Sequence, residues 1–527
     1  MKYRLFEISI EKEDAFDKQK HLFYVSKNLQ ISKDKIVSLK ISKRAIDARK
    51  KNHIVYKFNF DVTLEKGTKF SPLCKVQEIE ETKEEHEKIQ NPKTTVVVGS
   101  GPSGLFCALT LAEAGEKVVL LERGKKIEER EKDVENLLKN GVFNKNSNIQ
   151  FGEGGAGTFS DGKLNTGTKS KHIDTVLETF YSFGAPEEIL YDSKPHIGTD
   201  ELKKVIVNIR KHLENLGAKI LFESKFTNFE KYAKNIVVFF ENNAKVHKIE
   251  CENLVLALGY SARETFLTLY ERGLVFMQKP FSVGYRIEHK QKDINKAQYG
   301  TPSDKFLPPA DYKLFHHLEN GRTVYTFCMC PGGVVVPAFS DNGEICTNGM
   351  SYHSRSGENA NSAVLVSVSE KDYESSHPLA GMFFQQKLEK QAFEKGHGKC
   401  VVSTFESFKK HEACKVLGKV VPTIGINGRL GNCFELLPEV LADSVIKGIE
   451  EFGKKLKGFD SADAVLTGIE TRSSAPFMIE RNENKMTNFE NVYAIGEGAG
   501  RAGGIVSSAV DGIVIAKNII EKYGKKQ

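Results

Sequence analysis

The chain has 527 residues, of which 40% are hydrophobic and 28% are charged, a composition typical of folded globular proteins that excludes a largely disordered chain. This length exceeds what one hydrophobic core supports, so we expect roughly two to four domains. The 76 lysine and arginine residues exceed the 69 aspartate and glutamate residues by only 7 charges, which is too few over this length to indicate nucleic-acid binding by itself.

The sequence offers no sign of a membrane or secreted protein. It has no stretch of about 18 uncharged apolar residues, so we expect no transmembrane helix and no membrane partner. The N-terminus carries early acidic residues and no apolar signal-peptide core. Nine cysteines are an odd number scattered over a long chain, which argues against a disulfide scaffold and predicts a reducing, cytoplasmic location.

Residues 1–92 are predicted to form a small N-terminal α+β domain that ends in a linker. KYRLFEISI alternates like a strand, Lys12 to Lys27 is compatible with a helix, and two further strand-like segments follow. The segment from Lys27 to Lys75 contains thirteen basic residues and four acidic ones. This excess fits a docking face for RNA or an acidic partner, but we favour a solvated surface, since no aromatic platform for bases accompanies it. The acidic run Glu78–Glu87 is predicted to be the linker.

From Lys93 onward the pattern is that of an α/β protein. Residues 93–275 contain apolar strands, a glycine turn and an Ala/Leu-rich helix, which is typical of a parallel sheet covered on both faces. Residues 276–430 are rich in short strands and turns and predict an inserted, mostly antiparallel α+β substrate domain. Residues 431–527 return to a strand, a glycine turn and a helix. The predicted fold class is therefore α/β, with a three-layer Rossmann-like domain of glutathione-reductase type split by an insertion.

A dinucleotide-binding turn follows the first of these strands. Gly99 permits the tight turn, Gly101 lets the backbone approach a pyrophosphate, and Gly104 lets the helix pack closely on the sheet. Pro102 and Ser103 lie in the same turn, at the helix N-terminus that would face the phosphates. Eighteen residues after Gly104, Glu122 ends the second strand, where a carboxylate accepts ribose hydroxyls.

Among dinucleotides, the sequence favours FAD. An acidic residue at the ribose position excludes a 2′-phosphate and leaves NAD or FAD. A second glycine-rich element far downstream is needed by an extended FAD and not by NAD, and its helix N-terminus would point at the isoalloxazine. The additional residues predicted to contact FAD are Arg123 and Arg130, Gly259 at the end of a buried strand, and Gly496, Glu497, Gly503, Gly504 and Ile505 in AIGEGAGRAGGI.

With these residues placed, the chain resembles the uncharacterised FAD-dependent dehydrogenases (NAD(FAD)-utilizing dehydrogenases) of the glutathione-reductase-like flavoprotein superfamily. The matching segments include GSGPSGLFCALTLAEAG, GEGGAGTFSDGKL, CMCPGG, GIETRSSAPF and YAIGEGAGRAGGIVSSAVDG, which span residues 95–516. The resemblance implies FAD binding and an oxidoreductase activity, with no settled substrate, and from the glycine turn, Glu122 and the GEGAGRAGG element we expect non-covalent FAD. One departure is visible: a basic residue is expected near GIETRSSAP, where this chain has Phe477 and Met478 and places Arg481 further on.

The loop at residues 152–164 has five glycines in eleven residues, which suits close approach of backbone N–H groups to an anion or a flavin edge. We therefore predict that Gly154, Gly155 and Gly157 contact the flavin. Lys163 would then stabilise the reduced flavin near N1, or else anchor an acidic residue at the base of the loop.

Cys328 and Cys330 are separated by one residue, so in a strand both thiols would face the same side. They are candidates for a thiol pair that exchanges electrons with the flavin. We favour buried packing, because a disulfide across one residue is strained and buried thiols are mostly inert. No metal site is predicted, since His316 and His317 are poorly spaced for one.

The inserted domain also carries Arg286 and Glu288 on one face of a predicted strand, and Arg355 in MSYHSR. They are interpreted either as a buried ion pair that holds the domain or as an anion-binding wall over the flavin, with Arg286 and Arg355 as candidate catalytic residues.

Three functions stay open. The first is an FAD-dependent oxidoreductase that transfers hydride between flavin N5 and a small organic substrate, with NAD(P)H as a candidate transient electron donor. The second is an RNA-modifying flavoprotein docked through the basic N-terminal domain, although a nucleic-acid partner is not favoured. The third is an FAD-binding redox sensor or electron-transfer protein.

Overall fold

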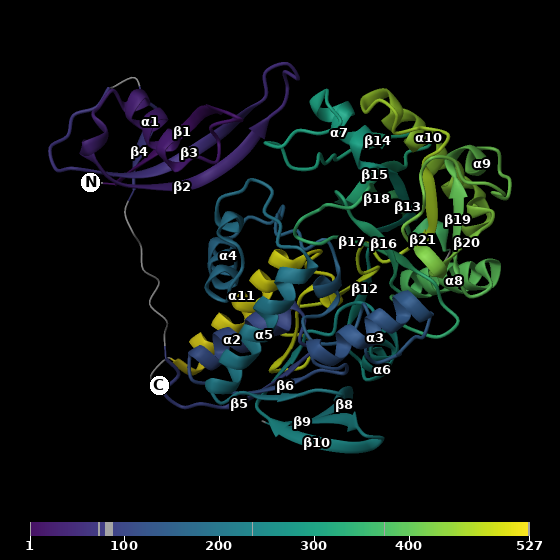
Figure 1. The fold of residues 1–527 in the computed structure, drawn as a ribbon. Coiled ribbons are helices and arrows are strands. Elements are labelled where there is room, and N and C mark those ends of the chain that lie inside the picture. The colour runs from purple at the N-terminus through teal and green to yellow at the C-terminus, as the bar shows by residue number, and fades with distance from the viewer. Residues whose placement is uncertain (1, 72–73, 80–87, 234, 374, 525–527) are drawn as a thin grey trace.

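The computed structural model describes residues 2–71, 74–79, 88–233, 235–373 and 375–524. It has three parts: a small N-terminal domain, a domain built on a parallel sheet, and a domain inserted into the latter (Figure 1). The predicted linker lies mostly outside the described residues. Within the described ranges, no helix is both long and apolar enough to cross a membrane.

A five-stranded parallel sheet forms the centre of the nucleotide-binding domain. Its strand order is β23-β11-β5-β6-β7. The strands are β5 (Thr94–Val98), β6 (Lys117–Leu121), β7 (Lys219–Leu221), β11 (Asn253–Leu256) and β23 (Val492–Ala494). The last strand lies more than 200 residues after β11, yet the two pair directly. The split of this domain by an insertion is therefore confirmed.

Each face of this sheet is covered by a different layer, which is why its strands are apolar throughout. Val97 and Val255 pack on the side of the helices, whereas Val96 and Leu254 pack on the side of an antiparallel meander. The helices are α2 (Pro102–Glu113), α4 (His172–Ser182), α5 (Thr199–Asn215) and α11 (Ile505–Gly524), and the meander is β8 (Lys225–Tyr232), β9 (Asn235–Asn242) and β10 (Lys245–Cys251). This confirms the predicted three layers.

The inserted domain is a seven-stranded, mostly antiparallel sheet of order β14-β15-β18-β13-β21-β19-β20. The strands are β13 (Phe281–Lys290), β14 (Phe315–His317), β15 (Thr323–Cys330), β18 (Asn359–Val368), β19 (Cys400–Thr404), β20 (Gly428–Leu430) and β21 (Val465–Glu470). Helices α8 (Ala380–Gly396) and α10 (Glu439–Lys455) contribute to the same core.

The predicted end of the inserted domain at residue 430 is too early. Strand β21 pairs with both β13 and β19, so the inserted sheet continues to Glu470. The segment before it contains an amphipathic helix, which by pattern alone fits either domain. Its apolar face packs on the inserted sheet because that sheet, and not the parallel one, has a face left to cover.

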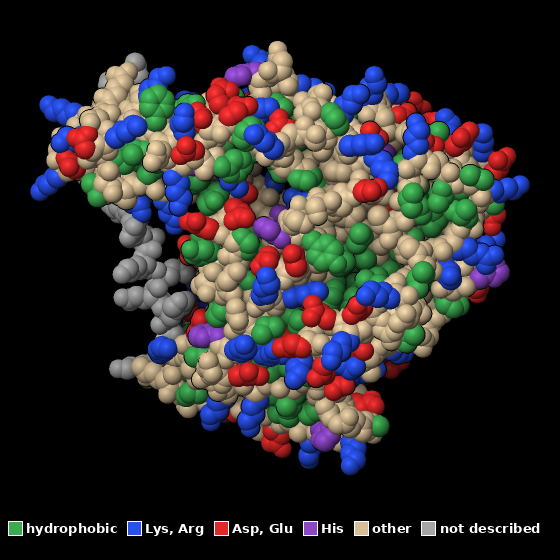
Figure 2. Space-filling view, in the orientation of Figure 1, with side chains coloured by type: hydrophobic (Ala, Val, Ile, Leu, Met, Phe, Trp, Pro, Cys, Tyr) green, Lys and Arg blue, Asp and Glu red, His purple; other side chains and the backbone are tan. Residues whose placement is uncertain are grey.

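The N-terminal domain is a four-stranded sheet of order β2-β3-β1-β4, with helix α1 (Lys18–Leu29) packed on one face. Its strands are β1 (Lys2–Glu11), β2 (Ile36–Asp47), β3 (Val55–Leu64) and β4 (Val76–Glu78). The helix begins later than predicted because Asp17 caps it, accepting from the backbone N–H of Gln19 at 2.8 Å. On the face shown in Figure 2, basic and acidic side chains alternate over this domain.

This domain is joined to both other parts of the molecule. Arg44 on β2 forms a bidentate ion pair with Asp192, at 2.7 and 3.0 Å, and exchanges backbone hydrogen bonds with Tyr191 and Ser193. Tyr56 on β3 donates its hydroxyl to the carbonyl of Phe306 in the inserted domain at 2.7 Å. The long β2–β3 hairpin therefore spans the junction between the two larger domains (Figure 1).

Candidate functional site

One cavity of about 460 Å³ extends from the glycine turn of the parallel sheet to the inserted domain. Most of the residues predicted from the sequence line it: Gly99, Gly101, Pro102, Ser103, Glu122, Arg123, Gly155, Gly157, Lys163, Gly259, Cys328, Arg355, Glu497, Gly503, Gly504 and Ile505. The predicted residues outside its wall are Gly104, Arg130, Gly154, Arg286, Cys330 and Gly496. The fold thus gathers segments from four distant parts of the chain around one space.

The three glycines of the turn have three different surroundings. Gly99 has φ +103°, and a Cβ there would lie 2.3 Å from the carbonyl oxygen of Ala257. A Cβ on Gly104 would lie 1.8 Å from the Gly99 oxygen, so this glycine serves close packing. A Cβ on Gly101 would meet only the Gly155 Cα, at 3.8 Å. The space beside Gly101 is therefore open on the cavity side, as a bound pyrophosphate requires.

Glu122 lies at the cavity wall, but its carboxylate is already well satisfied by protein donors. One oxygen accepts from the backbone N–H and hydroxyl of Ser100, at 3.0 and 2.6 Å, and the other accepts from the backbone N–H groups of Gly124 and Gly152. Four donors fill the lone-pair sites of a carboxylate. Glu122 thus ties the glycine turn to the glycine-rich loop, and its contact with a ribose stays a prediction.

The two arginines predicted to meet the adenosine or pyrophosphate have different roles. Arg123 lines the cavity and stacks on Phe151, with its guanidinium carbon 3.9 Å from the ring centre. Its Nε and one Nη are buried with no hydrogen-bond partner within the described part of the chain. Arg130 is fully buried and donates only to backbone carbonyls of residues 148–153, so the prediction that it contacts the cofactor is wrong. It clamps the start of the glycine-rich loop.

The glycine-rich loop packs directly on the glycine turn. A Cβ on Gly155 would lie 2.8 Å from the Gly101 Cα, and a Cβ on Gly157 would lie 3.1 Å from Ile505. Gly154 turns away from the cavity, because its Cβ position points at the Thr158 hydroxyl, 2.1 Å away. Gly155 and Gly157 therefore line the cavity, and their contact with the flavin stays a prediction, whereas Gly154 only allows the loop to turn.

The C-terminal glycine element brings a carboxyl group to the same cavity. Glu497 lines the cavity, and burial raises the pKa of its carboxyl group to about 8 although Lys279 lies nearby, so this group is largely protonated at neutral pH. Gly496, with φ +70°, lets the chain pass Ser103 closely and does not reach the cavity. Helix α11 begins at Ile505, directly after the lining residues Gly503 and Gly504. Its N-terminus therefore opens on the cavity.

These features fit a dinucleotide with a flavin. Open space beside Gly101 and the two unpartnered N–H groups of Arg123 suit phosphate oxygens. The carboxyl group of Glu497 suits ribityl hydroxyls, and the N-terminus of α11 suits a developing negative charge. A polar wall with unpaired donors and a pre-formed glycine cradle suits a large anionic cofactor.

The inserted-domain side of the cavity is centred on a buried carboxylate, Asp161. It lies 3.2 Å from the Arg355 guanidinium and 3.6 Å from the Lys163 ammonium, and it accepts a hydrogen bond from the Ser351 hydroxyl. Burial alone would raise the pKa of Asp161, but chiefly the charges of Lys163 and Arg355, together with the hydrogen bond from Ser351, lower it to about 2. Lys163 also donates to the Met329 carbonyl. The alternative role for Lys163, anchoring an acidic residue beside the loop, is therefore the one its contacts match.

Arg286 belongs to a buried ion pair, but its partner is not the predicted one. It forms a bidentate pair with Glu470 on β21, at 2.6 and 2.7 Å, and also donates to the Cys328 carbonyl. Glu288 instead accepts from Asn359 and from Thr423. Arg286 is fully buried and does not line the cavity, so direct contact with a substrate is contradicted.

The two cysteines do not face the same side, contrary to the prediction. A bulge between Phe327 and Cys330 interrupts the alternation of β15, and Cys328 has φ +44°. The Cys328 thiol opens on the cavity, whereas Cys330 is fully buried behind it and donates to the Cys328 carbonyl at 3.3 Å. Burial raises the pKa of Cys328 to about 11, so its thiol is protonated at neutral pH. A paired redox role for Cys330 has no support in this geometry.

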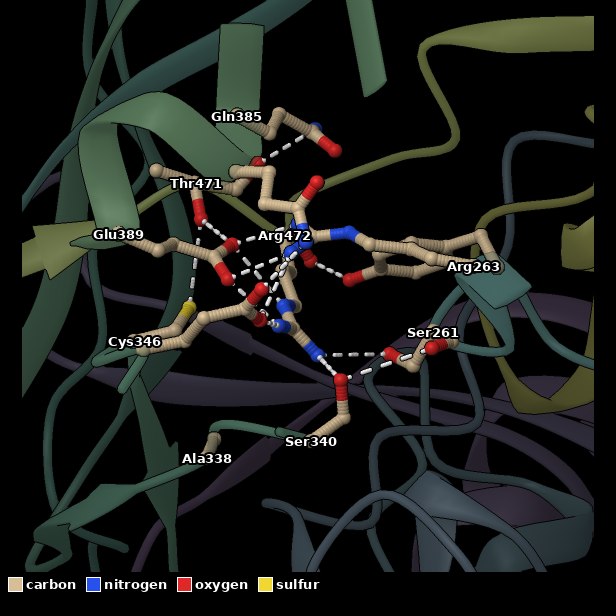
Figure 3. A network of polar contacts seen from close by, with 12 residues as sticks. Ser261, Arg263, Ala338, Ser340, Cys346, Gln385, Glu389, Thr471 and Arg472 are labelled. Atoms are coloured by element: carbon tan, nitrogen blue, oxygen red, sulfur yellow. Dashed lines mark hydrogen bonds and ion pairs between the residues drawn. The ribbon is translucent and has the colours of Figure 1, made fainter. Parts of the chain in front are cut away.

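A buried ionic network that sequence reasoning missed forms another part of the wall. We call Arg263, Glu344, Glu389 and Arg472 the interdomain latch (Figure 3). Glu389 on α8 accepts from Arg263, at 2.7 and 2.8 Å, and from Arg472, at 2.5 and 3.0 Å. Glu344 accepts from both arginines, and Arg472 donates further to the hydroxyls of Ser261 and Ser340.

The latch links the two large domains. It also includes the basic residue of the GIETRSSAP segment that lies at the cavity. Arg263 starts helix α6 (Arg263–Glu271) in the nucleotide-binding domain, whereas Glu389 lies in the inserted domain. The basic residue of this segment that lines the cavity is Arg472, and its donors are taken by the latch. Arg481 pairs with Asp511 and lies outside the cavity wall. Within the described ranges, no group of His, Cys, Asp and Glu side chains is arranged to hold a metal ion.

Comparison with known proteins gives three family matches. Residues 280–473 match the FAD-dependent protein, C-terminal domain-like family, and this span agrees with the inserted domain as the structure defines it. Residues 65–180 match the pyridine nucleotide-disulphide oxidoreductase family, and residues 2–63 match a domain of unknown function.

Two curated proteins are similar in sequence. An uncharacterized protein of Clostridium beijerinckii is 44% identical over 515 residues, which cover 95% of each chain. The ribosomal RNA dihydrouridine synthase of Haemophilus influenzae is 27% identical over 167 residues, or 31% of this chain and 39% of that protein. Among solved structures, halogenase PltM in complex with FAD aligns with a TM-score of 0.40 and 10% identity, covering 82% of this chain and 70% of that one.

Proposed function

This chain is an FAD-dependent oxidoreductase of the same family as the uncharacterized clostridial protein, and from that premise we propose that it transfers a hydride between the N5 atom of FAD and a small organic substrate. FAD is its cofactor. The observation that carries the proposal is the single cavity, which joins the dinucleotide turn to a wall of titratable side chains from the inserted domain. Bound flavin supplies the two-electron chemistry.

The residues of the chain divide this work between them. The glycine turn and Arg123, which line the cavity, would hold the phosphates of FAD, and Glu497 would hold its ribityl chain. Lys163 and Arg355 carry positive charge toward the reacting region, and the protonated thiol of Cys328 holds a proton beside it. These groups line one cavity between the two larger domains, and exclusion of water by a bound substrate would strengthen their electrostatic effect.

We further propose a place in the glutathione-reductase-like superfamily, with NAD(P)H as a transient electron donor. The match to the pyridine nucleotide-disulphide oxidoreductase family supports this assignment. The pattern G-x-G-x-x-G recurs at residues 152–157 and 498–503, but both segments contribute to the same cavity as the first turn, so we expect no separate, permanently bound NAD(P).

The proposal is tested on the purified protein. We expect a yellow protein that releases about one FAD per chain on heating or acidification. Anaerobic additions of NADH, NADPH and dithionite, followed by a screen of metabolites for reoxidation, identify the donor and the substrate class. Recovery of FMN or NAD in place of FAD would overturn the cofactor. A flavin that photoreduces but accepts electrons from no donor would favour a redox sensor.

Full reduction of the wild-type protein is expected to take about two electrons per FAD, because Cys328 and Cys330 do not form a redox pair. Replacing both by serine should leave this number unchanged and cost only stability, since a hydroxyl is buried where Cys330 was. An anaerobic dithionite titration measures it. A requirement of about four electrons in the wild type, falling to two in the double variant, would contradict this prediction.

A second candidate function, RNA modification, is favoured by one comparison and one surface. The relative from Haemophilus influenzae is named for its action on ribosomal RNA. On helix α1, Phe23 is exposed, and Lys27 and Lys33 lie 6.0 and 5.6 Å from its ring centre. An exposed aromatic ring flanked by lysines is the kind of platform on which RNA bases stack, and sequence reasoning had found none here.

This candidate is tested by salt-dependent binding of single-stranded RNA to the full chain. We expect Phe23→Ala to weaken binding about 5- to 100-fold if the platform stacks on bases, with FAD content unchanged. Equal binding by Phe23→Ala and wild type, or binding that does not fall with salt, would remove RNA as a substrate.

A further inference from the structure

The cavity carries an excess of positive charge on the side away from the parallel sheet. Four basic residues of the cavity wall, Lys163, Lys194, Lys313 and Arg355, are called the basic wall. They come from separate loops, and only two carboxylates, Asp161 and Asp311, line the cavity among them. The remaining lining carboxylate from the inserted domain, Glu470, is neutralised by Arg286. Such an arrangement attracts anions.

The inner half of the basic wall consists of Lys163 and Arg355, and their contacts leave it with a net positive charge. Asp161 is a single carboxylate facing both Lys163 and Arg355. His196 adds no charge at neutral pH, since burial lowers its pKa to about 3. The Nε of Arg355 is buried and has no hydrogen-bond partner within the described residues. Burying a guanidinium N–H without a hydrogen-bond acceptor costs free energy. This N–H group is therefore suited to donate to an oxyanion.

The outer half of the wall lies at the solvent side. Lys194 pairs with Asp311 at 2.7 Å, with the lysine side chain largely exposed, and Lys313 is exposed with no ion pair among the described residues. Lys194 follows Asp192 by two residues, at the point where Arg44 of the N-terminal domain docks. The outer half of the wall is therefore next to the docked hairpin.

We propose that the basic wall binds an oxyanion carried by the substrate, either a phosphate or a carboxylate group. This rests on the proposed function, because it names the substrate class of the same cavity. The oxyanion enters past Lys194 and Lys313 and is held by Arg355 and Lys163. Arg355 offers a planar fork of donors that matches oxyanion geometry, while Lys163 adds a point charge.

The test uses the FAD-loaded protein and calorimetric titration with inorganic phosphate and, separately, with acetate at constant ionic strength. We expect saturable binding of about one anion per chain that weakens as salt rises. Arg355→Gln should weaken it at least about tenfold, as loss of a charge-assisted hydrogen bond implies. Lys313→Gln, an exposed change that folding tolerates, should weaken it about two- to threefold. Lys139→Gln, which changes an exposed lysine on α3 (Ile127–Asn140), is the matched control and should bind as wild type.

The outcomes separate this inference from the proposed function. Tighter binding of phosphate than acetate assigns a phosphorylated substrate, and the reverse assigns a carboxylate. FAD-loaded protein that binds neither anion, or binds them equally well in Arg355→Gln and Lys313→Gln, overturns the basic wall and leaves the oxidoreductase standing. A shifted flavin reduction potential in Arg355→Gln without any anion binding also overturns it, because the wall then serves the flavin. A chain that lacks FAD fails the proposed function instead.

Discussion

A Gly101→Val chain is expected to fold and to lose its FAD. The backbone at Gly101 is extended, with φ −69° and ψ 178°, so a valine adopts it without strain. The nearest protein atom to its Cβ is 3.8 Å away, whereas the branched methyl groups would occupy the space that the pyrophosphate needs. FAD content should fall to less than about a tenth of wild type, which corresponds to at least about 1.4 kcal/mol of binding free energy.

Flavin absorbance per chain measures the loss of FAD, and far-UV circular dichroism measures whether the variant folds. Gly167→Val is the matched control, because Gly167 is exposed, lies outside the cavity wall and has no atom within 4 Å of its Cβ position. Gly104→Ala provides the opposite contrast: a Cβ 1.8 Å from a backbone oxygen should damage the fold itself. Stoichiometric FAD in Gly101→Val would show that the turn is structural and holds no phosphate.

The cofactor half of the site could be predicted from the sequence because local chemistry dictates it. A tight turn, a close backbone approach and a packed helix each demand glycine at one position, and the surrounding strands and helix are contiguous in the chain. The spacing alone therefore indicates the roles of Gly99, Gly101 and Gly104. The same holds for the helix that starts at Ile505 after two glycines.

The substrate half depends on contacts between distant segments, which spacing does not encode. The alternation rule failed at Cys328 because one bulge reverses the side a residue faces. Arg123 follows β6, whereas Arg130 lies within α3 and is buried because it donates to carbonyl groups of residues 148–153, which the local sequence does not reveal. The partner of Arg286 lies 184 residues away on a strand that had been assigned to another domain.

The interdomain latch leads to the second large expected effect: Glu389→Gln should strongly destabilise the protein. Glu389 is fully buried between Arg263 and Arg472. Burial alone would raise its pKa, but the two guanidinium groups outweigh that cost and hold the pKa below its ordinary value. Glutamine keeps the shape and removes the charge, which leaves two buried arginines facing only Glu344. Removing one partner of such a network costs about 3–5 kcal/mol, and we expect unfolding on the order of 10 °C lower.

Thermal unfolding followed by circular dichroism and by flavin release measures this effect. Since Arg472 and Ser261 line the cavity, FAD should be released together with the loss of structure. Glu135→Gln, in an exposed pair with Lys139 on α3, is the control and should unfold as wild type does. A Glu389→Gln chain that also unfolds as wild type would contradict the prediction and make the latch dispensable.

A double-mutant cycle distinguishes loss of charge balance from loss of packing. Adding Arg263→Gln to Glu389→Gln leaves Arg472 and Glu344, one charge of each sign, in contact at 3.2 Å. If the single change is harmful because it strands a buried positive charge, the second change removes that charge, and the double variant should be more stable than the sum of the two single effects predicts. If the latch acts only by filling space, the two losses should add. We expect a favourable coupling, because the two arginines and two glutamates balance in charge and each arginine donates to both acids.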